Sequence, residues 1–374
     1  MDGHKGRGRR KWEWMMARKH TGTAVAVAAL LAFGTGAASA AQFSADYVFG
    51  DSLSDRGNLA AALGHNFPSP PFFHDSFTNG PTAVQVMAQR LGLNADPSLF
   101  VTGFKNAIGY TAGGTNYAVA GATAGTSIPT GTSPSQGVPG ANLGAQINAF
   151  LALASGAVPA SALVTVFIGG NDVRTAAHQG STAYLTDGIS AELAGITKLL
   201  AAGAKNLLVV NVPDVGVIPE FTQFSPAGQA ATATKDSIAY NASLASGVAT
   251  IAAANAGTNI KLFDLFSFNN AYIANAASVG ITNTTDACYT AYDGVTNTPA
   301  TFLTINPACG AIDPATGQAA NIGQFQYWDT IHPTAKVQAA FGNALYAFEV
   351  PEPASMALLG VGVAVLGLIR RRAI

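Results

Sequence analysis

Short apolar runs alternate along the chain with longer, alanine-rich stretches. The short runs are rich in β-branched and aromatic residues and are bounded by turn-forming residues, which is typical of buried strands. The longer stretches have the length and composition of helices. The predicted strands are residues 46–50, 116–119, 163–168, 206–211 and 259–263, and the predicted helices are residues 81–91, 144–153, 182–202, 227–254 and a last one from 333 to about 348.

This alternation predicts a parallel β-sheet with helices on both faces, a three-layer α/β/α sandwich. Such sheets carry their functional groups on loops at the carboxyl ends of the strands. Residues 266–327 lack a clear pattern, and we interpret them as an irregular rim or cap. The body of the chain is therefore expected to be a single α/β domain.

The N-terminal residues 1–40 differ in character from this body. A basic run precedes an apolar stretch at 24–33 and the small-residue sequence Ala38-Ser39-Ala40, a combination typical of a secretory signal peptide. The apolar stretch is shorter than the roughly 20 residues that a membrane-spanning helix needs. We therefore assign 1–40 to a signal peptide and 41–349 to the mature domain.

The C-terminal residues 350–374 indicate a second targeting segment. Val350-Pro351-Glu352-Pro353 is followed by an apolar stretch at 356–369 and then by three arginines. This tail resembles the PEP-CTERM sorting signal of Gram-negative bacteria, whose basic end stays on the cytoplasmic side. The resemblance implies a transient inner-membrane anchor, a sorting protease, and delivery to the cell surface or extracellular matrix. A plain tail anchor is the alternative.

The distribution of charge excludes one class of function. The whole chain has a formal net charge of −1, but most of its basic residues lie in the two terminal segments. The body at 41–350 keeps nine basic and seventeen acidic residues. Because nucleic-acid binding needs a basic surface that neutralises phosphates, we expect no nucleic-acid partner.

The two cysteines, Cys288 and Cys309, fit an exported protein. In an oxidising compartment we expect them to form one disulfide, which contributes about 3 kcal/mol on the chain-entropy model. A catalytic thiol is disfavoured, because neither has a neighbouring histidine or basic residue in the sequence. The body has no His-Glu-x-x-His pair, no Cys/His cluster and no nucleotide-binding glycine loop, so we expect no metal and no other cofactor.

Two segments carry the residue types of nucleophilic catalysis. Ser52 follows the first strand, where its hydroxyl and its backbone N–H can face one crevice; a helix cap is the alternative. Asp329 and His332 precede the last helix, and their i, i+3 spacing lets a carboxylate orient an imidazole towards a nucleophile. For His332, a surface or capping role is the alternative.

Gly114 and Asn171 lie at two further predicted strand ends. Glycine lets the backbone turn its N–H towards a ligand, and the Asn171 side chain offers an N–H₂ donor. With the Ser52 N–H they predict a three-donor oxyanion hole, in which losing one donor costs about 2.7–4 kcal/mol of barrier. Turn geometry for the glycine and an Asx turn for the asparagine are the alternatives.

In their order along the chain, the four segments resemble the sequence blocks of the GDSL family of SGNH-type serine hydrolases. The resemblance implies a flavodoxin-like sandwich around about five parallel strands. It also implies that Ser52 is the nucleophile, His332 the general base and acid, and Asp329 its orienting carboxylate. The same resemblance makes Gly114 and Asn171 oxyanion donors beside the Ser52 N–H. The four blocks are Gly50-Asp51-Ser52-Leu53, Gly114-Thr115-Asn116-Tyr117-Ala118, Gly170-Asn171-Asp172 and Asp329-Thr330-Ile331-His332.

We therefore expect a lipase-, esterase- or phospholipase-like enzyme that hydrolyses a small-molecule or lipid ester through an acyl-serine intermediate. The loops at 66–75 and 121–140 are candidates for an apolar acyl pocket, with simple packing at the rim as the alternative. Surface delivery also suits deacetylation of an exopolysaccharide by the same residues. A non-catalytic surface or matrix protein is less favoured, because Ser52, Asn171 and His332 are all present.

Overall fold

The computed structural model describes residues 42–63, 67–68, 71–98, 113–127, 141–290, 304–313, 315–316 and 318–350. From Phe43 onwards these residues belong to one compact unit. The predicted signal peptide at 1–40 and nearly all of the sorting tail at 350–374 lie outside the described residues. Within the described part, no helix combines the length and the apolar character needed to cross a membrane.

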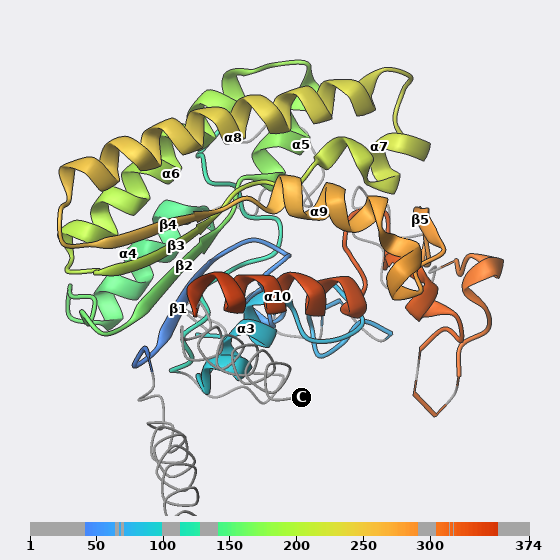
Figure 1. Cartoon of the computed structure of the whole chain (residues 1–374), viewed down its shortest axis with the longest axis horizontal. Helices are drawn as coiled ribbons and strands as arrows, with labels where there is room; N and C mark the ends of the chain where they lie inside the picture. The colour runs from blue at the N-terminus through green and yellow to red at the C-terminus, as the bar shows by residue number, and fades with distance from the viewer. Residues whose placement is uncertain are drawn as a thin grey trace, which may run out of the picture. The chain divides into compact units, whose positions relative to one another are not determined.

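A parallel four-stranded sheet forms the centre of this unit (Figure 1). The register pairs Gly50 with Phe167, Phe167 with Val210 and Val210 with Phe263. All four carboxyl ends therefore meet at one edge of the sheet, where parallel sheets place their functional loops. The strands, in spatial order, are β1 (Asp46–Gly50), β2 (Leu163–Phe167), β3 (Asn206–Val210) and β4 (Asn259–Phe263).

The strand predicted at 116–119 is reduced to an isolated parallel bridge between Asn116 and Val48, on the outer edge of β1. The Tyr117 N–H also donates to the Val48 carbonyl at 2.7 Å. The Val119 N–H donates to the Gly50 carbonyl at 3.2 Å, but the Gly50 N–H donates to Gln146 Oε1 at 2.9 Å, so the next bridge lacks one of its two hydrogen bonds. Counted as a rudimentary strand, this segment completes the flavodoxin-like order 2-1-3-4-5.

Helices cover the sheet on both faces, as predicted (Figure 1). One face carries α4 (Leu143–Leu153), α5 (Gly170–Gln179), α6 (Ala183–Ala201) and α8 (Gln229–Ala254), and the other carries α3 (Ala83–Leu91), α9 (Leu265–Ala274) and α10 (Ala335–Glu349). Two shorter helices, α2 (Asn58–Leu63) and α7 (Pro219–Gln223), lie in the loops after β1 and β3, and short 3₁₀ turns occupy Val215–Val217, Ala276–Val279, Pro307–Cys309 and Ile322–Gln324.

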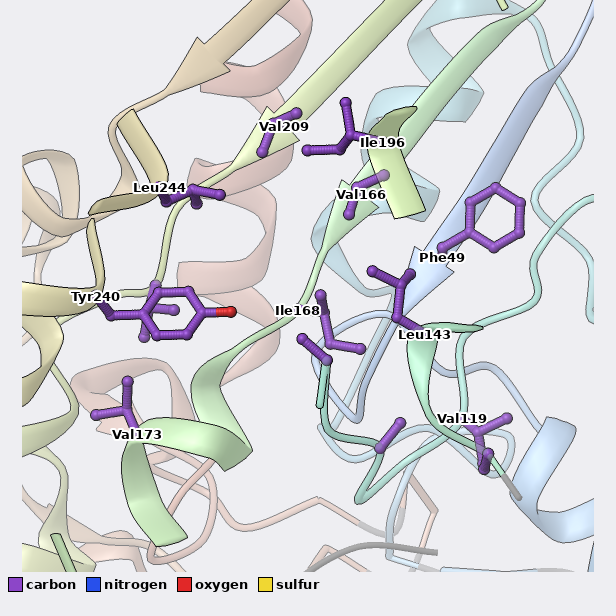
Figure 2. Close-up of a cluster of buried hydrophobic side chains, with 14 of the residues drawn as sticks. Phe49, Val119, Leu143, Val166, Ile168, Val173, Ile196, Val209, Tyr240 and Leu244 are labelled. Atoms are coloured by element: carbon purple, nitrogen blue, oxygen red, sulfur yellow. The ribbon is translucent and has the colours of Figure 1, made fainter. Parts of the chain in front are cut away.

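Strand side chains alternate between two apolar cores, one on each face. Figure 2 shows Val166 and Val209 of the sheet in one core, together with Ile196 of α6 and Leu244 of α8. Because both faces are buried, β2 and β3 are nearly continuous apolar runs in the sequence. The alternate strand positions enter the second core, whose buried members include Leu163, Phe167, Leu208, Val210, Met87, Val337 and Phe341.

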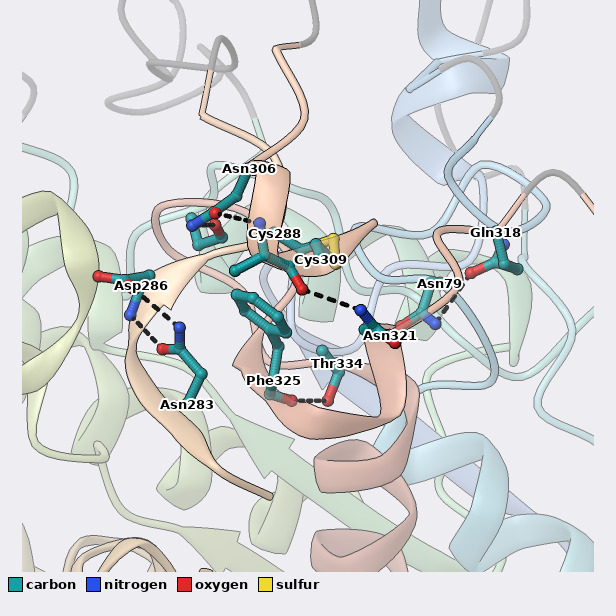
Figure 3. The surroundings of a disulfide bond; sticks show 12 residues. Asn79, Asn283, Asp286, Cys288, Asn306, Cys309, Gln318, Asn321, Phe325 and Thr334 are labelled. Carbon is teal, nitrogen blue, oxygen red and sulfur yellow. Dashed lines mark hydrogen bonds between the residues drawn. A yellow bond between two sulfur atoms is a disulfide. The ribbon is translucent and has the colours of Figure 1, made fainter. Parts of the chain in front are cut away.

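The region predicted to be irregular, 266–327, holds α9 and two short strands, β5 (Asn283–Ala287) and β6 (Phe325–Tyr327). The two strands form a separate parallel sheet. Beside it Cys288 and Cys309 form the predicted disulfide (Figure 3). The sulfur atoms lie in a small apolar cluster with Trp328, the residue that leads out of β6.

Candidate active site

Three side chains, one near the start of the domain and two near its end, form a hydrogen-bonded series. Ser52 Oγ lies 2.7 Å from His332 Nε2, and His332 Nδ1 lies 2.8 Å from Asp329 Oδ2. Asp329 and His332 are 0% and 3% exposed, whereas Ser52 is partly exposed. An imidazole held on one side by a buried carboxylate can take a proton from a hydroxyl on its other side.

The turn between β6 and α10 brings the carboxylate and the imidazole together. The Trp328 N–H donates to the His332 carbonyl at 2.7 Å and closes the turn. Asp329 Oδ1 accepts the backbone N–H groups of Ile331 at 2.8 Å and of His332 at 2.7 Å. The i, i+3 spacing thus places Asp329 beside the His332 ring through hydrogen bonds made within the turn itself.

Ser52 lies in a turn that is organised by Asp51. The Leu53 N–H donates to Asp51 Oδ1 at 2.9 Å, and the Ser54 and Asp55 N–H groups donate to the Asp51 carbonyl at 3.0 and 2.9 Å. Among the described residues, the Ser52 N–H has no acceptor. This N–H is therefore available to a ligand that approaches the Ser52 hydroxyl.

Asp55, not Ser52, caps the helix that follows. Its carboxylate accepts the backbone N–H groups of Gly57 and Asn58 at 2.8 Å each. It also accepts the Ala120 N–H at 2.8 Å and so joins a second loop to this turn. Burial raises the pKa of Asp55 to about 6, although these hydrogen bonds lower it. The capping alternative for Ser52 is thereby removed.

Asn171 lies in the first turn of α5, directly after β2. Its Nδ2 donates to the Ala122 carbonyl at 2.9 Å, and its Oδ1 accepts from Arg174 Nη1 at 2.9 Å. Because an amide nitrogen has two hydrogens, one N–H remains for a ligand. The helix can begin here because Gly169 adopts φ 106°, and a Cβ on that residue would lie 2.8 Å from the Tyr240 ring.

Gly114 lies in a different environment from the one its sequence block suggests. A Cβ on Gly114 would lie 2.1 Å from the Asp96 carbonyl oxygen, so this glycine serves a close approach between two loops. The backbone that contacts Asn171 is that of Ala122. The structure thus brings Ser52, Asn171, Asp329 and His332 to one edge of the sheet, while Gly114 packs against the loop after α3.

A pocket opens beside Ser52 and Asn171 at the carboxyl edge of the sheet. Apolar side chains from the loops after β1, β3 and β6 and from α10 line much of its wall: Leu53, Val215, Ile218, Ile331 and Phe341. None of the described residues in the loops at 66–75 and 121–140 lines it. The remaining positions of those two loops, 66, 69–70 and 128–140, lie outside the described residues.

The buried charges around the pocket include an ion pair that the sequence analysis missed. Arg174 Nε and Nη2 each lie 2.7 Å from a Glu220 carboxylate oxygen. Burial raises the pKa of Glu220, but the charges and hydrogen bonds of Arg174 and His178 together lower it to about 2. Burial raises the pKa of Asp51 to about 6. Throughout the described ranges, no group of three or more His, Cys, Asp or Glu side chains could hold a metal ion.

Most of the chain matches one known protein family. Residues 47–345 match the GDSL-like Lipase/Acylhydrolase family. The chain belongs to this family. Residues 349–372 match the PEP-CTERM protein-sorting motif. Both resemblances noted in the sequence are thereby confirmed, and so is a parallel sheet flanked by helices on both faces.

Two relatives of this GDSL-family chain carry names that involve lipids. It is 31% identical over 182 residues to "Lipase 1" of Photorhabdus luminescens. This alignment covers 48% of this chain and only 23% of that lipase. It is 25% identical over 332 residues to "Phosphatidylcholine-sterol acyltransferase" of Aeromonas hydrophila. This alignment covers 82% of this chain and 90% of that protein. Among solved structures, protein YXIM of Bacillus subtilis aligns with a TM-score of 0.37 and 14% identity, over 82% of this chain and 55% of that one.

Proposed function

We propose that this GDSL-family protein is a serine hydrolase that cleaves carboxylic esters through an acyl-serine intermediate. The observation that carries the proposal is the hydrogen-bonded series from Ser52 through His332 to Asp329. Ser52 Oγ attacks the ester carbonyl carbon while His332 Nε2 takes its proton and then passes it to the leaving alcohol. Water next attacks the acyl-enzyme, again with His332 as the base, which releases the acid and restores Ser52.

The charge that develops on the carbonyl oxygen needs donors, and we assign the Ser52 N–H and the free Asn171 N–H to this role. For the third donor we favour the Gly121 N–H over that of Gly114. Gly121 lies between Ala120, which Asp55 holds, and Ala122, which Asn171 contacts. Its φ of 77° turns the backbone there, and its N–H has no acceptor among the described residues.

The lining of the pocket supports an ester with an apolar acyl chain. Leu53, Val215 and Ile218 offer apolar surface next to Ser52, and each buried methylene of a chain contributes about 0.8 kcal/mol to binding. The names of the two relatives, a lipase and an acyltransferase that acts between phosphatidylcholine and a sterol, agree with such a substrate. The acyltransferase also favours a second candidate reaction, in which an alcohol replaces water in deacylation.

The two terminal segments support export to the cell surface. We propose that residues 1–40 direct secretion and that the sorting motif at 349–372 holds the protein at the inner membrane until a sorting protease releases it. A lipid or polysaccharide ester outside the cell would then be the substrate, and the disulfide would form in the same compartment.

Hydrolysis of p-nitrophenyl acetate, butyrate and palmitate by the full-length chain and by Ser52→Ala tests the proposal. We expect turnover with a preference for the longer chains and its loss in the variant. A preference for acetate would instead favour deacetylation of an exopolysaccharide. If folded protein turns over none of these esters and no fluorophosphonate probe labels Ser52, the hydrolase proposal fails and a binding role replaces it.

A further inference from the structure

Arg174 lines the pocket beside Asn171 and forms a buried ion pair with Glu220. Both side chains are largely buried, with side-chain exposures of 7% and 10%. Arg174 Nε and Nη2 bind the two carboxylate oxygens of Glu220, and the third nitrogen, Nη1, binds Asn171 Oδ1. Because every nitrogen of the planar guanidinium is engaged, both its position and its plane are determined.

The contacts of Asn171 allow only one orientation of its side-chain amide. Arg174 can only donate hydrogen bonds and therefore requires the amide oxygen. The Ala122 carbonyl can only accept and therefore requires the amide nitrogen. If the Arg174 contact were lost, only the Ala122 carbonyl would hold the amide, and its plane could tilt so that the second N–H points away from the oxyanion.

Glu220 also connects this arrangement to the turn that carries the acid–base residues. It lies in the first turn of α7, and its backbone N–H donates to the Thr330 carbonyl at 2.8 Å. Thr330 is one of the two residues between Asp329 and His332. Glu220 thus contacts the Asp329–His332 turn through its backbone and Arg174, which binds Asn171, through its side chain.

Stability alone is a weak reason for such a pair. Burying two charges costs desolvation energy that their attraction often fails to offset, so apolar residues of the same volume are frequently as stable. Arg174 and His178 hold the pKa of Glu220 at about 2, so the carboxylate that Arg174 binds is ionised at neutral pH.

We propose that Arg174 and Glu220 are positioning residues, which orient the Asn171 amide for the oxyanion and tie it to the Asp329–His332 turn. The inference rests on the proposed function, because it requires Asn171 to donate to the oxyanion. Neither residue needs to touch the substrate for this role. Replacing Arg174 or Glu220 is therefore expected to lower kcat, and only by disturbing Asn171.

A double-mutant cycle on the full-length chain tests this coupling. We compare Asn171→Ala, Arg174→Ala and the double variant by hydrolysis of p-nitrophenyl butyrate, with far-UV circular dichroism and urea midpoints to verify folding. Loss of one oxyanion donor lowers kcat about 10²–10³-fold, and we expect Asn171→Ala to fall in this range. Arg174→Ala should lose about 10–100-fold in kcat with little change in KM, and the double variant should be no slower than Asn171→Ala.

Arg90→Ala is the matched control, because this arginine lies on α3 and binds Asn343 of α10. It should keep the kcat of the wild type. If Arg174→Ala does not fold, Glu220→Gln, which keeps the side-chain shape, takes its place in the cycle and should show the same non-additivity.

Two results would overturn the inference. One is a double variant whose loss in kcat equals the product of the losses of Asn171→Ala and Arg174→Ala. The other is a raised KM at unchanged kcat in Arg174→Ala, which would make Arg174 a substrate-binding residue. Turnover that persists in Ser52→Ala would overturn the proposed function itself and the inference with it. Multiplying losses beside an inactive Ser52→Ala would overturn the inference alone.

Discussion

At the scale of single residues, the candidate site depends on Asp329. This carboxylate is fully buried, yet it accepts hydrogen bonds from two backbone N–H groups of its own turn and from the His332 ring. The backbone bonds hold its position, so its negative charge can be directed at the imidazole. In a site of low polarity, such a charge would stabilise the imidazolium that the proposed mechanism forms when Ser52 gives up its proton.

Replacing Asp329 with asparagine should lower kcat by about 10⁴-fold, the loss known for the equivalent change in a serine protease, because a neutral amide favours the wrong His332 tautomer. The amide oxygen can still accept the turn N–H groups, so folding should be retained. Steady-state hydrolysis of p-nitrophenyl butyrate measures the effect. Asp46→Asn, a buried carboxylate at the opposite end of β1, is the control. Equal kcat in both variants would contradict the role of Asp329.

At the scale of elements, the small β5–β6 sheet supports the residues that lead into the Asp329–His332 turn. The Cys288 N–H donates to the Tyr327 carbonyl at 3.2 Å, and the Tyr289 N–H donates to the Trp328 carbonyl at 2.9 Å. The disulfide from Cys288 to Cys309 closes the loop after β5 next to these bonds (Figure 3). The cross-link therefore supports the two residues that lead directly into Asp329.

Changing both cysteines to alanine should lower the free energy of unfolding by about 3 kcal/mol, because the unfolded chain regains the freedom of the open loop. Urea unfolding with and without dithiothreitol measures this. The wild type should lose stability when reduced, whereas the double variant should respond little to the reductant. A wild type that unfolds at the same urea concentration under both conditions would show that the bond contributes nothing.

The start of α5 is the second element on which the site depends. Gly169→Ala should lower kcat by about 100-fold, because its Cβ meets the Tyr240 ring at 2.8 Å and the shift displaces Asn171. Gly180→Ala is the matched control at the other end of the helix, where φ is also positive but a Cβ meets nothing within 4 Å. The positive φ should cost each variant about 1–2 kcal/mol of stability, Gly169→Ala should lose more through its contact with Tyr240, and only Gly169→Ala should lose activity. Similar kcat values in Gly169→Ala and Gly180→Ala would contradict a role for the start of α5 in the reaction.

At the scale of the whole molecule, the domain buries several carboxyl groups in the sheet and its helix layers. Burial raises the pKa of Asp46 and of Asp172 to about 7 each. It raises the pKa of Glu192 to about 8, although a hydrogen bond from the Tyr240 hydroxyl at 2.7 Å lowers it. These groups favour a neutral form in the folded protein, which makes global stability depend on pH.

The sign of this dependence follows from Glu192. Between its ordinary pKa of 4.5 and about 8, the unfolded chain has lost the proton and the folded protein keeps it. Its contribution to stability is complete below that window and is lost as the pH rises through 8. Glu192→Gln should therefore make the decline from pH 5 to 8 shallower, by up to about 1.4 kcal/mol per pH unit.

Urea unfolding at pH 5, 6, 7, 8 and 9 measures this change in slope. The remaining decline should come from Asp46 and Asp172 and, at the lower pH values, from Asp51 and Asp55, because the pKa values of all four are raised in the same direction. Asp313→Asn, a change to an exposed carboxylate, is the control and should leave the slope unchanged. A Glu192→Gln variant with the wild-type slope would contradict the prediction.

Features that depend on neighbours close in the chain were predictable from the sequence. The runs of β2 and β3 are apolar because a parallel sheet buries both faces, and these runs predicted the strand positions. The longer alanine-rich stretches predicted the helices. The helix α5 was missed, because Asp172 and Arg174 are buried polar residues that interrupt its apolar pattern. The strand expected at 116–119 is incomplete, because a side chain from α4, Gln146, takes the N–H that would extend it.

The sequence alone determined the α/β class, the pairing of Asp329 with His332 and the identity of Ser52 and Asn171 as candidates. These depend on local spacing and on residue type. Only the tertiary structure decided that Ser52 meets His332 across 280 positions, that Asn171 binds the Ala122 carbonyl, and that Arg174 reaches Glu220. Such contacts depend on the path of the whole chain, because the sheet brings together strand ends that are far apart in sequence.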